Sequence, residues 1–338
     1  MSTHKDPVRW GIAGTGGISA NTVSQAKGLA GVAFAAVSSR TSDRASAFAA
    51  EHGIAGVHAG LASLLSDPGV EAVYIALPHA SHADAILACL DAGKHVLCEK
   101  PLAFSAADAK RIAGHPRARD LVIAEGFMTR VQPQWRFVTE TIGAGRIGAV
   151  EAVHGISAVR LPAPPPDPTR GELPFDRSAL LDFGSYSVHM ARTAFAAEPR
   201  RVTARMWKDG ARDTAVSMRL DFEAGHADLT VTTRLRGARG FNVLGTDGSL
   251  SVAMPIHIPP GQKARVHAVL SDGPDAGESF EFDAVPQYGL HIQAVSEAIR
   301  SGGRPPVDLD DALGNARVLD AVIRSAAGDS AWVEVDRG

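Results

Sequence analysis

His95-Val96-Leu97-Cys98-Glu99-Lys100-Pro101 is a short apolar stretch that ends in an acid, a base and a proline. The apolar residues predict a strand buried in a parallel sheet. Ligands of such sheets bind beyond the carboxyl ends of the strands, which is where Glu99 and Lys100 fall. Because Pro101 has a fixed φ and disfavours a helical conformation at Lys100, we expect the backbone to hold the lysine amine at the edge of the sheet.

The length and composition bound the class of protein. A chain of 338 residues predicts two domains of ordinary size, and 45% hydrophobic with 21% charged residues is typical of a globular enzyme. The net charge of −3 gives no reason to expect nucleic acid or an anionic membrane as a partner. The polar start and the lack of a long apolar run predict a cytoplasmic protein without a signal peptide or membrane span.

The two cysteines, Cys89 and Cys98, fall in segments that we expect to be buried, and they suit a reducing compartment. No group of His, Cys, Asp or Glu has the sequence spacing of a metal site. We therefore expect no metal ion.

Strands and helices alternate in the first part of the chain. Strands are predicted at 8–13, 32–38, 73–77, 95–98 and 121–124, and helices at 42–51, 81–92 and 105–113. Ser105 with Asp108 three residues later is a helix-start signal. Repeated strand-helix-strand units predict an α/β domain with a doubly wound parallel sheet, the Rossmann arrangement, over residues 1–126.

The pattern changes in the second predicted domain, 127–338. A helix at 133–142 precedes strands at 150–160, 201–207, 215–222, 226–235, 241–245, 249–253, 265–270 and 279–282, and helices at 287–300 and 310–326 close the chain. Apolar and polar residues alternate in several strands, so we expect a large, mostly antiparallel sheet. The final helix is a candidate for packing back on the first domain. The proline-rich segment 161–168 is a loop near the domain cleft or a surface connector.

A glycine-rich loop, Gly14-Thr15-Gly16-Gly17-Ile18-Ser19, lies between the first strand and a helix. In this context such a loop binds the pyrophosphate of a dinucleotide on backbone N–H groups. We assign Gly14, Thr15, Gly16, Gly17 and Ile18 to the cofactor. Ser19 takes the packing position that is usually Gly or Ala.

The end of the second strand predicts the choice of cofactor. A carboxylate there would bind the ribose 2′-hydroxyl of NAD, but this chain has Ser38-Ser39-Arg40-Thr41, and Asp43 comes several residues late. Ser39 and Arg40 suit a 2′-phosphate, so we predict NADP(H). If Arg40 is only a solvated loop residue, NAD(H) binds as well.

Further cofactor contacts are expected after the third and fourth predicted strands. The candidates are Leu77, Pro78, His79, His82, Glu99 and Lys100. A catalytic role for His82 is also conceivable, and a helix-capping or packing role is at least an equal alternative to it.

The predicted helix at 178–195 has two stripes. Leu181, Gly184, Val188, Ala191 and Phe195 share a core-facing side, whereas Asp182, Tyr186 and His189 lie nearly opposite. The second stripe is either a solvent-facing surface or a group of substrate contacts. An acid and a phenol are groups that proton transfer beside a hydride acceptor requires.

Four motifs together resemble the glucose-fructose oxidoreductase, inositol dehydrogenase and rhizopine catabolism (Gfo/Idh/MocA) family over the whole chain. They are Gly93-Lys94-His95 with Glu99-Lys100-Pro101, the glycine loop, Glu125-Gly126-Phe127-Met128-Thr129-Arg130, and Leu181-Asp182-Phe183-Gly184-Ser185-Tyr186. Tyr at position 186 is similar to the dihydrodiol dehydrogenase branch. The resemblance implies an open-sheet second domain whose outer face commonly forms a dimer interface, hence a homodimer or homotetramer. It also implies catalytic roles for Lys100, Asp182 and Tyr186.

The expected activity is hydride transfer between nicotinamide and a carbinol or carbonyl carbon of a sugar, polyol or cyclic trans-diol. Tyr186 or Lys100 moves the proton, and Asp182 holds the lysine or a substrate hydroxyl. Other substrate-contact candidates are Arg130, His189, Trp135 and Arg160. Two alternatives stay open: an NADP-binding sensor without catalysis, and a glycosidase with tightly bound nicotinamide.

Overall fold

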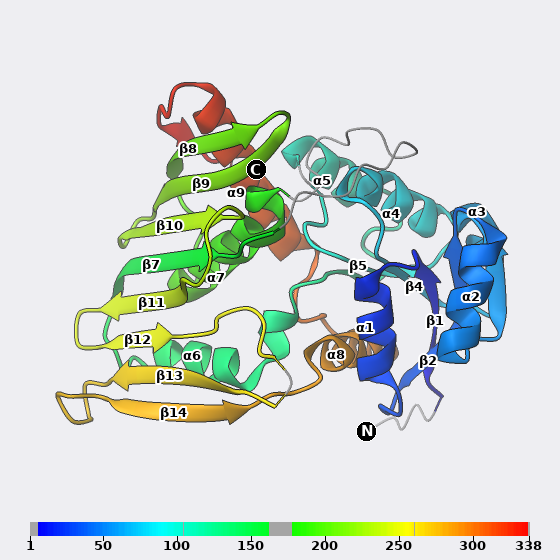
Figure 1. Cartoon of the computed structure of the whole chain (residues 1–338), viewed down its shortest axis with the longest axis horizontal. Coiled ribbons are helices and arrows are strands. Elements are labelled where there is room, and N and C mark those ends of the chain that lie inside the picture. Colours follow the sequence, from blue (N-terminus) through cyan, green and yellow to red (C-terminus); the bar gives the residue numbers. More distant parts are fainter. Residues whose placement is uncertain (1–5, 104, 162–177, 260, 337–338) are drawn as a thin grey trace. The chain divides into compact units, whose positions relative to one another are not determined.

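The computed structural model describes residues 6–103, 105–161, 178–259 and 261–336. The chain divides into two compact units, Met1–Val131 with Pro286–Leu313 and Gln132–Val285 with Gly314–Gly338 (Figure 1). The sequence-based division gave everything after residue 126 to the second domain. Residues 286–313 instead belong with the first unit, because their apolar side chains enter its core.

The first unit contains a six-stranded, fully parallel sheet in the order β3-β2-β1-β4-β5-β6. The strands are β1 (Val8–Ala13), β2 (Val32–Ser39), β3 (Gly56–Ala59), β4 (Ala72–Ile75), β5 (His95–Cys98) and β6 (Ile123–Glu125). This confirms the predicted doubly wound sheet. The order reverses between β1 and β4, which is where ligands of such sheets bind.

Helices surround this sheet. They are α1 (Gly17–Ala26), α2 (Ser42–His52), α3 (Leu61–Leu65), α4 (His82–Asp91), α5 (Ala106–Ala113) and α8 (Gln287–Ser301), with short 3₁₀ turns η1 (His79–Ser81) and η2 (Met128–Val131). Ser105 accepts a hydrogen bond from the Asp108 N–H, so the predicted helix-start signal is confirmed.

Helix α8 completes the core of the first unit. Ile292 and Val295 are fully buried in one cluster with Trp10 of β1 and Tyr74 of β4. The indole Nε1 of Trp10 also donates a hydrogen bond to Ser296 Oγ over 3.0 Å. A late segment of the chain therefore supplies part of the packing that stabilises the parallel sheet.

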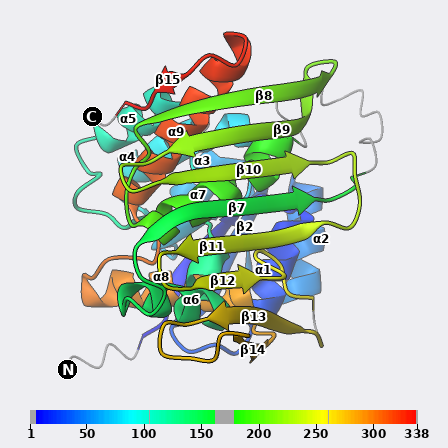
Figure 2. The same ribbon diagram turned by 90° about the vertical axis from the view of Figure 1, so that its left-hand side faces the viewer.

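The second unit contains a nine-stranded sheet in the order β14-β13-β12-β11-β7-β10-β9-β8-β15, which Figure 2 shows face on. The strands are β7 (Val150–Ala158), β8 (Arg201–Asp209), β9 (Arg212–Asp221), β10 (His226–Thr232), β11 (Arg239–Gly245), β12 (Ser249–Val252), β13 (Lys263–Val269), β14 (Glu278–Asp283) and β15 (Val333–Glu334). All neighbouring strands are antiparallel except β7 and β10, which pair in parallel. The predicted mostly antiparallel sheet is confirmed.

One face of this sheet packs against helices. They are α6 (Pro133–Gly143) on β13 and β14, and α7 (Ser185–Phe195), which follows the π-helical turn η3 (Leu180–Gly184), on β7 and β10. The last helix is α9 (Leu309–Ala327). Residues 162–168 of the predicted proline-rich loop lie outside the described residues.

The predicted burial of the two cysteines is confirmed. Cys89 and Cys98 are buried free thiols. Among the described residues, no helix has the length and apolar character needed to cross a bilayer.

Candidate active site

The glycine loop of the first unit lies at the point where the strand order reverses. Gly14 has a φ of +109° and hydrogen-bonds Ser38 O through its N–H. A Cβ on Gly14 would lie 2.4 Å from the carbonyl oxygen of Ala76, after β4, so only glycine fits. Gly16 and Gly17 have no atom within 4 Å of such a Cβ position. An open loop at the start of α1 is a suitable cradle for a phosphate.

The end of β2 lies beside this loop. Thr15 Oγ1 donates a hydrogen bond to Ser39 Oγ over 3.3 Å. Arg40 is exposed, and Asp43 is exposed in the first turn of α2. Ser19 is fully buried at the start of α1, as its packing position requires. The loop and the end of β2 therefore offer hydroxyls and a guanidinium, but no carboxylate directly after the strand.

A buried hydrogen-bonded chain joins this loop's helix to the segment that carries Lys100. Tyr74 Oη donates to Glu99 Oε1 over 2.7 Å and lies 3.1 Å from Thr22 Oγ1 of α1. Burial raises the pKa of Glu99, whereas the Tyr74 hydrogen bond and the Lys100 ammonium act in the opposite direction. The carboxyl end of β5 is thus fixed from two neighbouring elements.

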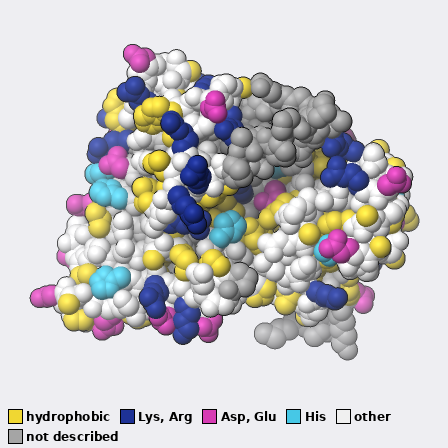
Figure 3. All heavy atoms as spheres, in the orientation of Figure 1, with side chains coloured by type: hydrophobic (Ala, Val, Ile, Leu, Met, Phe, Trp, Pro, Cys, Tyr) yellow, Lys and Arg dark blue, Asp and Glu magenta, His cyan; other side chains and the backbone are white. Residues whose placement is uncertain are grey.

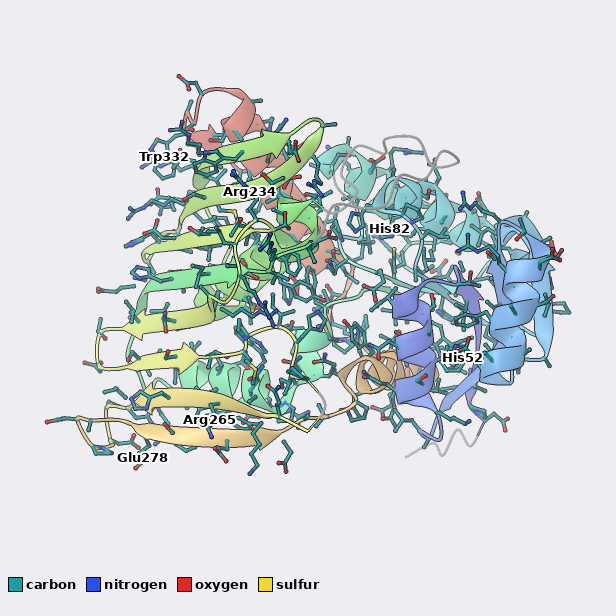
Figure 4. All side chains as sticks on the ribbon, in the orientation of Figure 1. His52, His82, Arg234, Arg265, Glu278 and Trp332 are labelled. Atoms are coloured by element: carbon teal, nitrogen blue, oxygen red, sulfur yellow. The ribbon has the colours of Figure 1, made fainter. Side chains whose placement is uncertain are left out.

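His82 connects the segments that follow β4 and β5. Its Nδ1 lies 2.8 Å from the carbonyl oxygen of Pro101, and its Nε2 lies 2.9 Å from that of Leu77. The ring is fully buried at the start of α4 (Figure 4). Burial lowers the pKa of His82, and burial together with the Lys100 ammonium lowers the pKa of His79 to about 3. The contacts of His82 favour the packing alternative over a catalytic role.

In the second unit, a π-helical turn carries Asp182. The Leu180 N–H donates to Asp213 Oδ2 over 2.7 Å, and the Leu181 N–H donates to Ser178 Oγ over 2.9 Å. These acceptors satisfy N–H groups that the start of a helix leaves without intrahelical partners. The helix starts at Leu180 rather than at the predicted residue 178. Single π-helical turns are frequent at functional sites.

Tyr186 and His189 are not on a solvent-facing stripe. Their side chains are only 2% and 1% exposed, respectively, and Asp182 is half-buried. The prediction that the other side of the helix faces the core is confirmed at Leu181, Gly184 and Val188, which are buried. The alternative that this stripe faces solvent was wrong. Helical spacing shows which side chains share a side of the helix, but it does not show which other elements pack against that side.

A cavity of about 250 Å³ lies next to this helix within the second unit. It is lined by Ser157, Val159, Phe183, Arg239, Met254, Pro255, Ile256 and His257. The ring of His257 faces the ring of Tyr186 at a centroid distance of 6.4 Å. Sequence reasoning missed the segment 254–257, which is distant from Tyr186 in the chain. Asp182, Tyr186 and His189 do not line the cavity; His257, which does, connects its wall to the predicted catalytic tyrosine.

Three buried side chains hold that cavity wall. Gln132 Nε2 donates to Ile256 O over 2.7 Å, Gln134 Nε2 to Met254 O over 2.9 Å, and Trp135 Nε1 to Pro255 O over 2.6 Å. Trp135 is 4% exposed and also packs on Phe241. The proposed substrate contact of Trp135 is therefore corrected: its polar group is engaged by the backbone.

The two predicted arginine contacts lie in different places. Arg130 Nε donates to Pro306 O over 3.3 Å within the first unit. Arg160 is exposed in the second unit and lines a basic pocket of about 410 Å³ with Lys208, Arg212 and Arg234. Of the predicted catalytic residues, Lys100 belongs to the first unit, and Asp182 and Tyr186 belong to the second.

A doubly wound parallel sheet with an open glycine loop, followed by a unit with an open nine-stranded sheet, is the organisation of a dinucleotide-dependent oxidoreductase. The model of the oxidoreductase family with an NAD-binding Rossmann fold (Gfo/Idh/MocA) matches residues 8–127. The Gfo/Idh/MocA C-terminal domain model matches residues 135–251. The chain belongs to this family, which confirms the predicted family, the fold class and an NAD(P)-dependent oxidoreductase.

Similar proteins span nearly the whole chain. D-xylose 1-dehydrogenase (NADP⁺) 2 of Haloferax volcanii is 32% identical and covers 97% of this chain and 99% of its own length. Human trans-1,2-dihydrobenzene-1,2-diol dehydrogenase is 28% identical, with coverages of 95% and 97%. A 3-ketoreductase from Actinomadura kijaniata, solved with TDP-benzene and NADP, is 28% identical with a TM-score of 0.81 and coverages of 95% and 98%.

Proposed function

We propose that this oxidoreductase transfers a hydride between NADP(H) and a carbinol or carbonyl carbon of a sugar, polyol or cyclic trans-diol. The observation that carries the proposal is the open glycine loop at the strand-order reversal, in the same unit as the Lys100 segment. The xylose and dihydrobenzenediol dehydrogenases support the substrate class, because both names specify hydroxyl-bearing substrates.

The proposed preference for NADP(H) is based on the residues at the end of β2. Ser39 and Arg40 are donors suited to a 2′-phosphate, and Asp43 is displaced into α2. The NADP-bound ketoreductase and the NADP⁺-dependent xylose dehydrogenase are consistent with this preference. The competing possibility is equal use of NAD(H), in which Arg40 contributes nothing to binding.

The catalytic roles are assigned to Lys100, Asp182 and Tyr186. When bound, the nicotinamide supplies or accepts the hydride. In the oxidative direction, the substrate hydroxyl loses its proton to Tyr186 or Lys100, and in the reductive direction the same group returns a proton to the oxygen. Asp182 positions the lysine or a substrate hydroxyl. His189, buried one helical turn after Tyr186, and Arg130 are proposed as further substrate contacts.

The cavity beside Tyr186 supports a polyhydroxyl or cyclic substrate. Its volume of about 250 Å³ accommodates a single sugar-sized ring, and its wall combines Phe183 with the imidazole of His257. Apolar walls with a few polar groups are typical of small-molecule sites.

We further propose a cytoplasmic homodimer or homotetramer that associates through the outer face of the nine-stranded sheet. Ile156 of β7 and Trp207 of β8 are each 41% exposed. Large apolar side chains at a surface are common at protein interfaces. Sedimentation velocity should give at least twice the mass of one chain, and a monomer at micromolar concentration would contradict this assembly.

The test of function is a panel of sugars, inositols and trans-diols, assayed by NADPH absorbance in both directions. Oxidation or reduction of at least one class, with a change in absorbance that matches product formed, is the expected result. Turnover of a glycoside without net absorbance change would favour the glycosidase alternative. Tight NADPH binding with no turnover of any compound would favour the sensor.

A further inference from the structure

A basic pocket of about 410 Å³ lies in the second unit, at the ends of β7, β8, β9 and β10. Its cationic side chains belong to Arg160, Lys208, Arg212 and Arg234. Figure 4 labels Arg234, and in Figure 3 lysine and arginine side chains reach the surface over the ends of β9 and β10. The proposed hydride transfer makes no use of this pocket.

The pocket lies on the side of the sheet that η3 covers. Val231 of β10 is buried, and a Cβ on Gly184 of η3 would lie 3.5 Å from its Cγ2 atom. Thr233 follows two residues later and lines the pocket, and it shares this side because side chains alternate along a strand. At the start of β9, Asp213 accepts the hydrogen bond from the Leu180 N–H of the same η3 turn. The pocket is therefore not on the outer face that we propose for subunit association.

The pocket adjoins the proposed substrate cavity. Val159 lines the cavity of about 250 Å³, and Leu161 lines the basic pocket. These residues are two positions apart, so their Cα atoms are at most about 7 Å apart. The Val159 N–H donates to Thr232 O and the Leu161 N–H donates to Thr233 O, which fixes both to the end of β10. A ligand longer than one sugar ring can therefore extend from the cavity into the pocket.

The charges of the pocket are unbalanced. Among the lining residues that the structure describes, Asp209 is the only carboxylate, and it lies 3.4 Å from Arg212 Nη2. Within the same described part of the chain, Arg160, Lys208 and Arg234 form no ion pair. Three positive charges thus remain around one hollow. A concave site lined by charges of one sign concentrates ligands of the opposite sign.

The chemistry of these groups favours a phosphoryl ligand. Arginine binds phosphate through two parallel hydrogen bonds. A phosphate ester carries a charge of about −1.5 to −2 near neutral pH, which matches several cations better than one carboxylate does. The buried hydroxyls of Thr214 and Thr233 donate to the carbonyls of Trp207 and Thr214, so recognition is left to the cations. The volume lies in the range of small-molecule sites, roughly 300–1,000 Å³.

We propose that the basic pocket binds a phosphoryl group of the substrate. The enzyme then acts on a phosphorylated sugar or polyol, whose ring occupies the neighbouring cavity. This inference rests on the proposed function for the ring and its oxidation or reduction. The binding of the anion itself depends only on the pocket.

The first test is calorimetric titration of inorganic pyrophosphate into NADPH-saturated full-length protein, because NADPH then occupies the glycine loop. We expect a dissociation constant below about 100 µM. Arg160→Met and Arg234→Met should each weaken binding about tenfold or more. Arg236→Met is the matched control, since Arg236 is exposed two residues after Arg234 but does not line the pocket. Thermal unfolding should show that all three variants keep the fold.

The second test compares free sugars, sugar phosphates, nucleoside diphosphate sugars and uronic acids as substrates. At least one phosphorylated form should have a kcat/KM about tenfold or more above that of its free sugar. Arg234→Met should remove this advantage and leave kcat/KM for the free sugar unchanged. The sugar phosphates and the nucleoside diphosphate sugars distinguish a terminal phosphate from a bridging diphosphate.

Two results would overturn the inference. One is pyrophosphate binding that is absent below about 1 mM, or that Arg234→Met and Arg236→Met weaken equally. The other is turnover of free sugars or uronic acids with a kcat/KM equal to or above that of every phosphorylated form. Pyrophosphate binding that requires Arg160 and Arg234, without oxidation or reduction of any compound, would support the pocket and contradict only the proposed function.

Discussion

The indole Nε1 of Trp135 donates a hydrogen bond to the carbonyl oxygen of Pro255 over 2.6 Å. This contact joins the start of α6 to the wall of the cavity beside Tyr186. Gln132 and Gln134 hold the neighbouring carbonyl groups of the same wall. The shape of the proposed substrate cavity is therefore set by side chains that do not line it.

Trp135→Phe tests this role, because phenylalanine keeps an aromatic ring and loses only the donor. We expect unfolding free energy to fall by about 1–2 kcal/mol, since the Pro255 carbonyl loses its partner. Substrate KM should rise severalfold while NADPH affinity is unchanged. Trp10→Phe is the matched control: it loses the bond to Ser296 in the first unit and should reduce stability without raising substrate KM. Equal KM changes in both variants would refute the positioning role.

Lys100→Met and Tyr186→Phe test the proposed proton transfer. Each should lower kcat by roughly 10² to 10⁴, the usual contribution of a general acid or base. The thermal unfolding midpoint and NADPH binding should remain close to those of the parent enzyme. If neither variant loses at least tenfold in turnover, the catalytic assignment is wrong.

Arg40→Ala tests cofactor preference. Loss of a charged hydrogen bond to the 2′-phosphate should raise the KM for NADPH by about 10- to 100-fold, which corresponds to about 1.5–3 kcal/mol. kcat/KM with NADH should change little. Arg44→Ala removes the same charge from an exposed position on α2 and serves as the control. An unchanged NADPH-to-NADH ratio in Arg40→Ala would exclude the proposed contact.

His82→Ala tests the link between the segments after β4 and β5. The neutral imidazole donates to one of its two neighbouring backbone carbonyls, and that carbonyl loses its buried donor. We therefore expect a stability loss of about 1–3 kcal/mol and a lower kcat through displacement of Lys100. His82→Gln, which retains a donor, should recover part of both. His58→Ala removes contacts to Ser63 and Asp67 elsewhere in the unit, and should leave kcat unchanged.

The buried imidazole of His291 predicts a pH dependence of stability. Burial lowers its pKa from 6.5 to about 4, so the unfolded chain binds more protons between these values. This contribution is fully present above pH 6.5 and is lost as the pH falls toward 4. His291→Gln should reduce the loss of unfolding free energy over this interval by at most about 3 kcal/mol. Urea titrations at several pH values would measure it; parallel curves for both proteins would contradict the assignment.

The parallel sheet and the glycine loop could be predicted because short apolar segments, helix-start signals and the glycine spacing are all local features of the sequence. Strand β3 was missed because it is a short edge strand whose Val57 is 39% exposed, so neither apolar character nor alternation marks it. Asp182 and Tyr186 were proposed as site residues from helical spacing and family resemblance, and their roles remain predictions.

Contacts between distant strands and loops were beyond sequence reasoning. The Tyr186–His257 contact and the pairing of His154 with Asp228 between β7 and β10 join segments whose proximity follows from tertiary packing and strand order. A sequence pattern predicts which face of a strand is buried, but not which strand lies beside it. The parallel neighbours β7 and β10 illustrate this limit within an otherwise antiparallel sheet.

The return of α8 to the first unit has a consequence for biosynthesis. A ribosome that has released only residues 1–131 has exposed all six parallel strands, but not Ile292, Val295 and Ser296, which cover Trp10. The nucleotide-binding half therefore cannot finish folding first, although domains usually mature in order of synthesis. Nascent chains truncated before α8 should need chaperones to remain in solution.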